Sequence, residues 1–208
     1  WEKTTHIPFI VVAPGVTEPG SRCTVPVDLS VIYPTLLELC DLTADPKSDG
    51  VSILPLLQNA KARWDRPALM TYGRGNHAVR SARWRYIRYS DGSEEFYDHK
   101  NDPREWKNIA SNPRHAAVIK EHQKWLPKRE AAQAPDLKGK RKSNVSVPSQ
   151  RPNILLIVSE DNGPELGCYG DPFVKTPVLD KLAADGVRFD RAYAAQAGCS
   201  QSRAAFLT

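Results

Sequence analysis

The sequence predicts an α/β fold, in which a mixed sheet is flanked by helices and a small antiparallel sheet lies beside it. Two apolar runs, Ile7–Ala13 and Asn153–Val158, are each followed by a Gly-containing turn, which is typical of buried strands. Segments with helical spacing and segments with strand alternation lie between these runs. The 208 residues are enough for one domain with a sizeable core.

The segment after the first run is predicted to be helical. A turn at 18–21 precedes Asp28, which is predicted to open a helix whose apolar residues follow at helical spacing. These apolar residues are Val31, Ile32, Leu36, Leu37, Leu39 and Cys40. Cys40 is therefore interpreted as a core residue, and a turn with a short helical segment is predicted over 49–57.

A small antiparallel sheet is predicted next. Its strands are expected at 68–72, 77–83, 84–90 and 94–98, with Asp91-Gly92 as the turn between the last two. Aromatic residues alternate along it and are interpreted as one packing face: Trp84, Tyr86, Tyr89, Phe96 and Tyr97. A helix is predicted from His115 to Leu126, ending at Pro127.

The stretch 128–150 is predicted to be a flexible linker, because it is charged and has no apolar periodicity. It holds the basic run 138–142, which contributes to a net charge of +5. Such a run could bind nucleic acid or an anionic surface, but we favour a solvated linker. The four cysteines, Cys23, Cys40, Cys168 and Cys199, show neither metal-binding nor redox spacing.

Two groups near the end of the chain are candidates for chemistry. Glu160 and Asp161 follow the second apolar run, at the sheet edge where a bound cation would offset their charge. A polar strand cap exposed to water is the alternative. Cys199 lies at a predicted loop-to-helix junction with Arg203 four residues later, which favours an activated nucleophile. The alternative for Cys199 is a small apolar thiol at a helix start.

Four ordered motifs place these residues in a known context. They occupy 151–161, 167–171, 176–183 and 199–208, and together they resemble the opening of a type I sulfatase. The resemblance implies an alkaline-phosphatase-like α/β fold, a calcium ion, and a formylglycine made from the cysteine.

The resemblance also implies a reaction. In the family, the cysteine of a Cys-x-Pro-x-Arg signature becomes formylglycine, and one hydroxyl of its hydrated aldehyde attacks sulfur while the ester oxygen leaves. The second hydroxyl then loses its proton, the aldehyde re-forms and sulfate is expelled. Cys199 and Arg203 match this signature, whereas Gln201 replaces the proline that the maturation enzyme usually meets. Glu160 replaces a usual aspartate, so Asp161 is the stronger metal ligand.

The first part of the chain resembles the other end of a sulfatase. Residues 1–127 resemble a late core strand followed by the family's antiparallel C-terminal subdomain. Residues 151–208 resemble the N-terminal part of a sulfatase, and the linker 128–150 connects the two parts. Lys3 matches a lysine that reaches the sulfate group, although a solvated lysine is an equal alternative. His77, in a Gly-rich turn, is a weaker candidate for substrate binding.

This order fits either two tandem modules or a circular permutation, and in the second case 7–13 and 154–158 could pair. The resemblance implies a sulfuric ester hydrolase for sulfated carbohydrates or similar esters, in a periplasmic or secreted setting, with a maturation enzyme as partner. The alternatives are a phosphoester or phosphonate hydrolase on the same fold, and an inactive fragment. We expect the 208 residues alone to be inactive, because further family metal ligands are absent from them.

Overall fold

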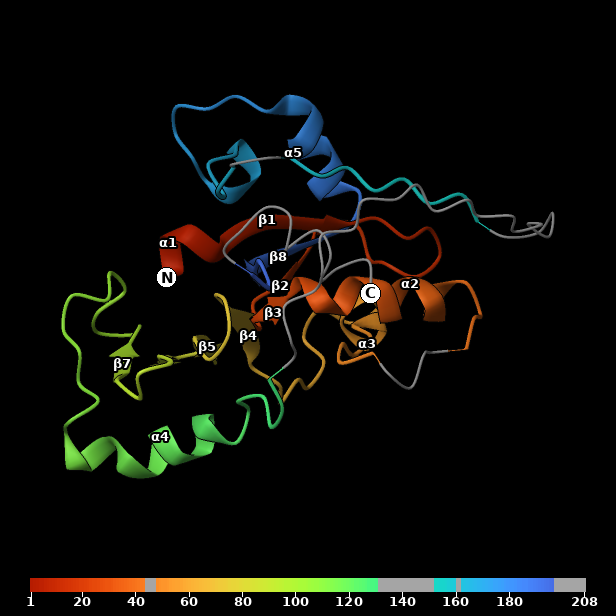
Figure 1. The fold of residues 1–208 in the computed structure, drawn as a ribbon. Helices are drawn as coiled ribbons and strands as arrows, with labels where there is room; N and C mark the ends of the chain where they lie inside the picture. The colour runs from red at the N-terminus through yellow and green to blue at the C-terminus, as the bar shows by residue number, and fades with distance from the viewer. Residues whose placement is uncertain (44–47, 131–151, 160–161, 197–208) are drawn as a thin grey trace, which may run out of the picture.

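The computed structural model describes residues 1–43, 48–130, 152–159 and 162–196. Its first sheet contains β1 (His6–Val11), β2 (Ser21–Cys23), β3 (Val27–Asp28) and β8 (Val187–Tyr193). The strand order is β1-β8-β2, and β3 also pairs with β8. Figure 1 shows this sheet between α5 on one side and the α2 and α3 helices on the other, which confirms the predicted α/β class.

Strand β8 is the centre of this sheet. It pairs antiparallel with β1 and parallel with both β2 and β3, so segments from opposite ends of the chain lie side by side. Its apolar residues Val187, Phe189 and Ala192 are fully buried. The sequence analysis did not predict this strand, although Val187 and Phe189 alternate with Arg188 and Asp190, a period that indicates a half-buried strand.

The predicted strand at 153–158 is wrong. These residues form no regular element, and their side chains are exposed, with Leu155 at 84% and Ile157 at 70%. An apolar run becomes a strand only where a neighbouring strand satisfies its backbone groups. β1 takes β8 as its partner instead, so the suggested pairing of 7–13 with 154–158 is also wrong.

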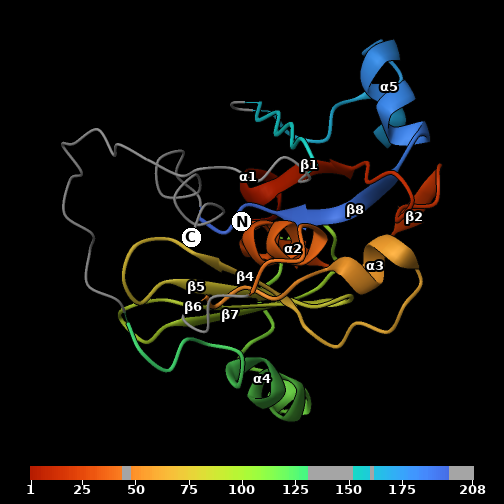
Figure 2. The ribbon, with the colours of Figure 1, turned by 90° about the vertical axis from the view of Figure 1, so that its right-hand side faces the viewer.

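The predicted antiparallel sheet is confirmed. It consists of β4 (Ala68–Thr71), β5 (His77–Arg80), β6 (Trp84–Arg88) and β7 (Glu94–Asp98), paired in sequence order. The turn between β6 and β7 uses Gly92 at a φ of 86°, a left-handed conformation that glycine adopts without strain. Figure 2 shows α4 on one side of this sheet and α2 on the other.

The aromatic residues of this sheet do not form a single packing face. Trp84 and Phe96 stack with ring centroids 5.0 Å apart, in a cluster with Tyr86 and Ile119 of α4. Tyr97 and Tyr89 instead pack in a cluster with Tyr193 of β8. The split follows from the two-residue period of a strand. Trp84 and Tyr86 are two residues apart and lie on the same face, whereas Tyr89 is an odd number of residues from both and lies on the other face.

The helices predicted after Asp28, within 49–57 and at 115–126 are confirmed, with shorter bounds, whereas those at 2–5 and 177–184 were not among the predicted elements. The helices are α1 (Glu2–Thr5), α2 (Ile32–Leu39), α3 (Leu54–Gln58), α4 (Ala116–Gln123) and α5 (Pro177–Ala184), with 3-10 turns at Leu29–Val31, Pro113–His115 and Gly167–Tyr169. Asp28 caps the turn before α2 by accepting a 3.0 Å hydrogen bond from the Ser30 N–H. Cys40 is half-buried at the end of α2 rather than a core residue. None of the described helices is long and apolar enough to cross a membrane.

Candidate functional site

Four of the predicted site residues lie outside the described residues. These are Glu160, Asp161, Cys199 and Arg203, and their predicted roles stay predictions. The predicted linker lies outside them as well, except for its first three residues, 128–130.

The segment that leads from β8 toward Cys199 is held on both sides. The Ala194 N–H donates to the Thr5 carbonyl over 2.8 Å, and the Thr71 N–H donates to the Ala195 carbonyl over 2.8 Å. Gln196 forms a parallel bridge with Thr71. The end of α1 and the end of β4 therefore fix the direction in which the chain leaves the sheet.

Lys3 lies on α1, next to this segment. Its side chain is exposed, whereas Thr5 is fully buried two residues later. Because Thr5 contacts the chain five residues before Cys199, the structure brings the Lys3 helix beside the strand end that leads to the predicted nucleophile. Contact between Lys3 and a sulfate group stays a prediction.

His77 is the first residue of β5, as predicted, and its side chain is buried, only 1% exposed; its predicted contact with a substrate stays a prediction. Its Nδ1 lies 3.0 Å from the Thr71 Oγ1, and its Nε2 lies 2.7 Å from the Glu130 Oε1. The hydrogen bond from His77 is the main reason why the pKa of Glu130 is lowered. His77 therefore joins the Thr71 hydroxyl to the Glu130 carboxylate.

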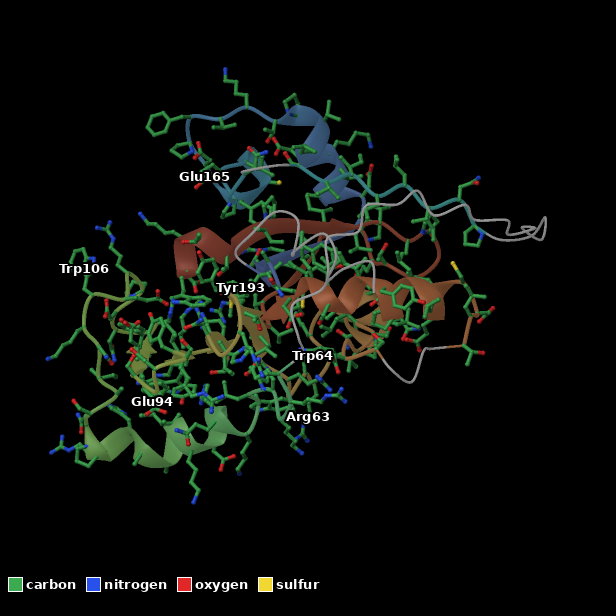
Figure 3. All side chains as sticks on the ribbon, viewed as in Figure 1. Arg63, Trp64, Glu94, Trp106, Glu165 and Tyr193 are labelled. Atoms are coloured by element: carbon green, nitrogen blue, oxygen red, sulfur yellow. The ribbon has the colours of Figure 1, made fainter. Side chains whose placement is uncertain are left out.

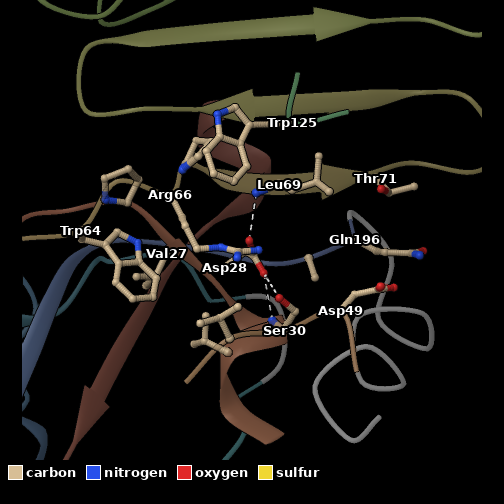
Figure 4. Close-up of a pocket in the computed structure, with 15 residues that line it drawn as sticks. Val27, Asp28, Ser30, Asp49, Trp64, Arg66, Leu69, Thr71, Trp125 and Gln196 are labelled. Carbon is tan, nitrogen blue, oxygen red and sulfur yellow. Dashed lines mark hydrogen bonds between the residues drawn. The ribbon is translucent and has the colours of Figure 1, made fainter. Parts of the chain in front are cut away.

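A cavity of about 230 Å³ opens beside Thr71. Its lining comes from β3, β4, the loop before β4 and the segment after α4, and it includes Asp28, Asp49, Trp64, Arg66, Trp125 and Gln196. Figure 4 shows the Arg66 guanidinium beside the Asp28 carboxylate, with Trp64 and Trp125 on the walls. The cavity is thus both polar and aromatic.

Asp28 is the most buried carboxylate of this cavity. Burial raises its pKa, while hydrogen bonds from Ser30 and from the Leu69 N–H, at 2.9 Å, and the charge of Arg66 act in the opposite direction. These contacts tie β3 to β4, so Asp28 is a structural bridge between the two sheets as well as part of the lining.

A second polar cluster joins α1 to the antiparallel sheet. Glu2 accepts a 3.1 Å hydrogen bond from Arg80 and another from the fully buried Arg85, and the Tyr193 hydroxyl donates to its other oxygen over 2.8 Å. Glu105 lies 2.6 Å from the Arg85 Nε, without ideal hydrogen-bond geometry. Figure 3 shows Tyr193 in the interior of the molecule.

Three members of this cluster, Glu2, His99 and Glu105, place possible metal ligands within 4.8 Å of one another. Calcium prefers six to eight oxygen ligands, whereas this group offers two carboxylates and an imidazole. The guanidiniums of Arg80 and Arg85 already neutralise these carboxylates. We therefore interpret the cluster as an ion-pair network, distinct from the predicted calcium site at Asp161.

Family models match both parts of the chain. Residues 1–132 match the model described as N-sulphoglucosamine sulphohydrolase, C-terminal. The chain belongs to the sulfatase family. The remaining part of this sulfatase, residues 152–208, matches the model named Sulfatase, and the family predicted from the motifs is thereby confirmed.

Curated relatives of this sulfatase carry the same family name. A sulfatase of Formosa agariphila is 40% identical over 131 residues, which are 63% of this chain and 26% of the relative. A Delta 4,5-hexuronate-2-O-sulfatase of Bacteroides thetaiotaomicron is 28% identical over 61% of this chain and 28% of its own length. The chain therefore spans about a quarter of the length of these relatives.

Two further similarities cover smaller parts of the chain. The iduronate 2-sulfatase of Mus musculus is 54% identical over 56 residues, which are 27% of this chain and 10% of the relative. A solved 2-O GAG sulfatase structure covers 44% of this chain and 22% of its own, with 30% identity and a TM-score of 0.36.

Proposed function

We propose that the protein containing this chain hydrolyses sulfate esters of carbohydrates, using a formylglycine made from Cys199. The observation that carries the proposal is that the Sulfatase model matches 152–208, the part that contains Cys199 and Arg203. When hydrated, formylglycine would supply a hydroxyl for attack on sulfur as the ester oxygen leaves, and Arg203 would hold that group by charge-assisted hydrogen bonds. Lys3 is proposed to stabilise charge on the leaving oxygen.

The family matches favour sulfuric esters over phosphoesters and phosphonates as the substrates. Many phosphatases on this fold use Ser or Thr without the arginine, whereas this chain has Cys199 and Arg203. The carbohydrate substrate class is supported by relatives whose names specify hexuronate, iduronate or N-acetylgalactosamine sulfates. The proposal extends to a maturation enzyme that acts on Cys199 and to a periplasmic or secreted setting.

We further propose that 1–127 is the C-terminal part of a sulfatase module and 151–208 an N-terminal part, joined by 128–150. This is supported by the order of the two family matches, in which a C-terminal model precedes the Sulfatase model. The pairing of β1 with β8 supports a shared sheet between the two parts.

Hydrolysis is tested with a generic aryl sulfate and an aryl phosphate at saturating calcium. We expect sulfate release by the protein that contains this chain, after co-expression with a maturation enzyme. The 208 residues alone are expected to be inactive and serve as a comparison. Preferential cleavage of the aryl phosphate would replace the proposal with a phosphoester hydrolase.

Asp161→Asn is expected to weaken calcium binding by at least about tenfold and to lower activity more than Glu160→Gln does. The reason is that an amide keeps one oxygen ligand but removes the negative charge that attracts the cation. Calcium affinity is measured by calorimetry and activity by sulfate release across a calcium titration. Activity that persists after exhaustive chelation would contradict any metal role for the pair.

A further inference from the structure

We propose that the cavity beside Thr71 binds one uncharged sugar ring of the substrate, next to the ring that carries the reacting sulfate. This inference rests on the proposed function, whose substrates are sulfated carbohydrates. The volume of about 230 Å³ is below the roughly 300–1,000 Å³ of pockets that enclose whole drug-sized ligands. It suits a single ring that enters from an open side.

The walls of the cavity match the surface of a sugar ring. A sugar has apolar C–H faces and a rim of hydroxyl groups, and tryptophan likewise combines an apolar ring with one polar N–H. Trp64 and Trp125 both line the cavity, and Trp125 is 40% exposed. The Arg66 guanidinium lies 5.6 Å from the centre of the Trp125 ring, so a hydrogen-bond donor accompanies the aromatic face.

One lining group has a buried donor without an acceptor. The Trp64 Nε1 is inaccessible to solvent and has no hydrogen-bond partner among the described residues. Buried N–H groups in folded proteins are nearly always paired, because an unpaired one loses its hydration without compensation. Trp64 therefore contributes its apolar ring, rather than this N–H, to the wall of the cavity.

The charges of the cavity favour a neutral ring over the sulfate group itself. Arg66 shares the lining with two carboxyl groups, those of Asp28 and Asp49. Asp49 adds an exposed carboxylate, which would repel an anion but accepts hydrogen bonds from hydroxyl groups. Thr71 contributes a hydroxyl that is hydrogen-bonded to His77, and His77 in turn contacts Glu130.

The cavity lies within a short chain distance of the predicted nucleophile. Gln196 is part of its lining and precedes Cys199 by three residues. A stretch of three residues spans at most about 11 Å, which is the upper limit that the chain itself sets on this separation. A second cavity of about 160 Å³ also has Trp64, Arg66 and Trp125 in its lining.

The test measures binding directly, with the 208-residue chain and without turnover. Heparin-derived and chondroitin-derived disaccharides, their desulfated counterparts and sodium sulfate are titrated by calorimetry and tryptophan fluorescence. We expect at least one disaccharide to bind in both sulfated and desulfated form, and sodium sulfate neither to bind nor to compete. Trp125→Ala should weaken binding at least about tenfold, because it removes an aromatic face.

Two further variants sharpen the test. Trp64→Ala removes the second aromatic wall, and we expect it to weaken binding about threefold to tenfold. Trp106→Ala is the matched control, because Trp106 is 79% exposed and lies at the edge of the molecule far from Trp64 (Figure 3). Circular dichroism confirms that each variant is folded.

Several results would overturn the inference. They are the absence of binding by every disaccharide, unchanged binding in both tryptophan variants, and full competition by sodium sulfate. The last of these would identify the cavity as an anion site. Failure of the proposed hydrolysis is seen separately in the aryl sulfate assay, so sugar binding without hydrolysis supports this inference while contradicting the proposed function.

Discussion

Replacing Cys199 with alanine is expected to abolish hydrolysis of sulfate esters, with a loss in kcat of roughly 10⁴-fold or more. Alanine cannot be converted to formylglycine, so no hydroxyl is available to attack sulfur. The measurement is sulfate release from an aryl sulfate by matured wild-type and variant protein, together with peptide mass spectrometry of the segment around residue 199. The wild-type peptide should carry an aldehyde at this position.

The matched control is Cys168→Ala. Cys168 is a half-buried thiol whose pKa is raised by burial and by Asp180, and it has no predicted part in the reaction. This variant should retain wild-type activity. Undiminished hydrolysis by Cys199→Ala, or an active wild-type enzyme that contains only the unmodified thiol, would show that another group is the nucleophile.

Replacing Glu2 with glutamine is expected to lower the free energy of unfolding by about 3 kcal/mol at neutral pH. The substitution leaves Arg80 and Arg85, whose side chains are 4% and 0% exposed, without the carboxylate that both of them contact. Urea denaturation of both proteins measures the difference. Glu121→Gln is the control, because the ion pair of Glu121 with Lys124 is exposed and is expected to contribute less than about 1 kcal/mol.

The same substitution is expected to remove a pH dependence. Burial alone would raise the pKa of Glu2, but Arg85 and Arg80 outweigh it and lower the pKa from 4.5 to about 2. The Glu2 carboxylate therefore binds a proton more readily in the unfolded than in the folded protein. The contribution of Glu2 to the free energy of unfolding is complete above about pH 4.5 and disappears as the pH falls toward 2. The wild type and Glu2→Gln should converge in stability across this window. A constant difference between pH 6 and pH 3 would contradict the assignment.

Local patterns predicted most of the first 127 residues. The antiparallel strands follow from two-residue alternation and a glycine turn at Gly92, and the start of α2 follows from Asp28 as a cap. These features depend on near neighbours in the chain, so they are visible without a tertiary structure. The family motifs likewise identified the sulfatase relationship, which the matches at 1–132 and 152–208 confirm.

Long-range pairing was beyond those patterns. The run at 153–158 has the composition of a buried strand, yet the strand that pairs with β1 is β8, whose residues alternate between apolar and polar. Composition reports how apolar a segment is, whereas strand formation depends on which segment supplies the hydrogen-bond partners. Local patterns likewise placed His77 at the start of a strand, but not its contacts with Thr71 and Glu130.

The sequence by itself determined the family of this chain and predicts Cys199 as the reacting group, because both rest on residue types at short spacing in its last motifs. Only the tertiary structure decided that β1 and β8 share a sheet, that Glu2 meets Arg80 and Arg85, and that two tryptophans line one cavity. These contacts join residues more than fifty positions apart, and their formation depends on the balance between burial and the cost of closing long loops. No local pattern of residues contains that balance.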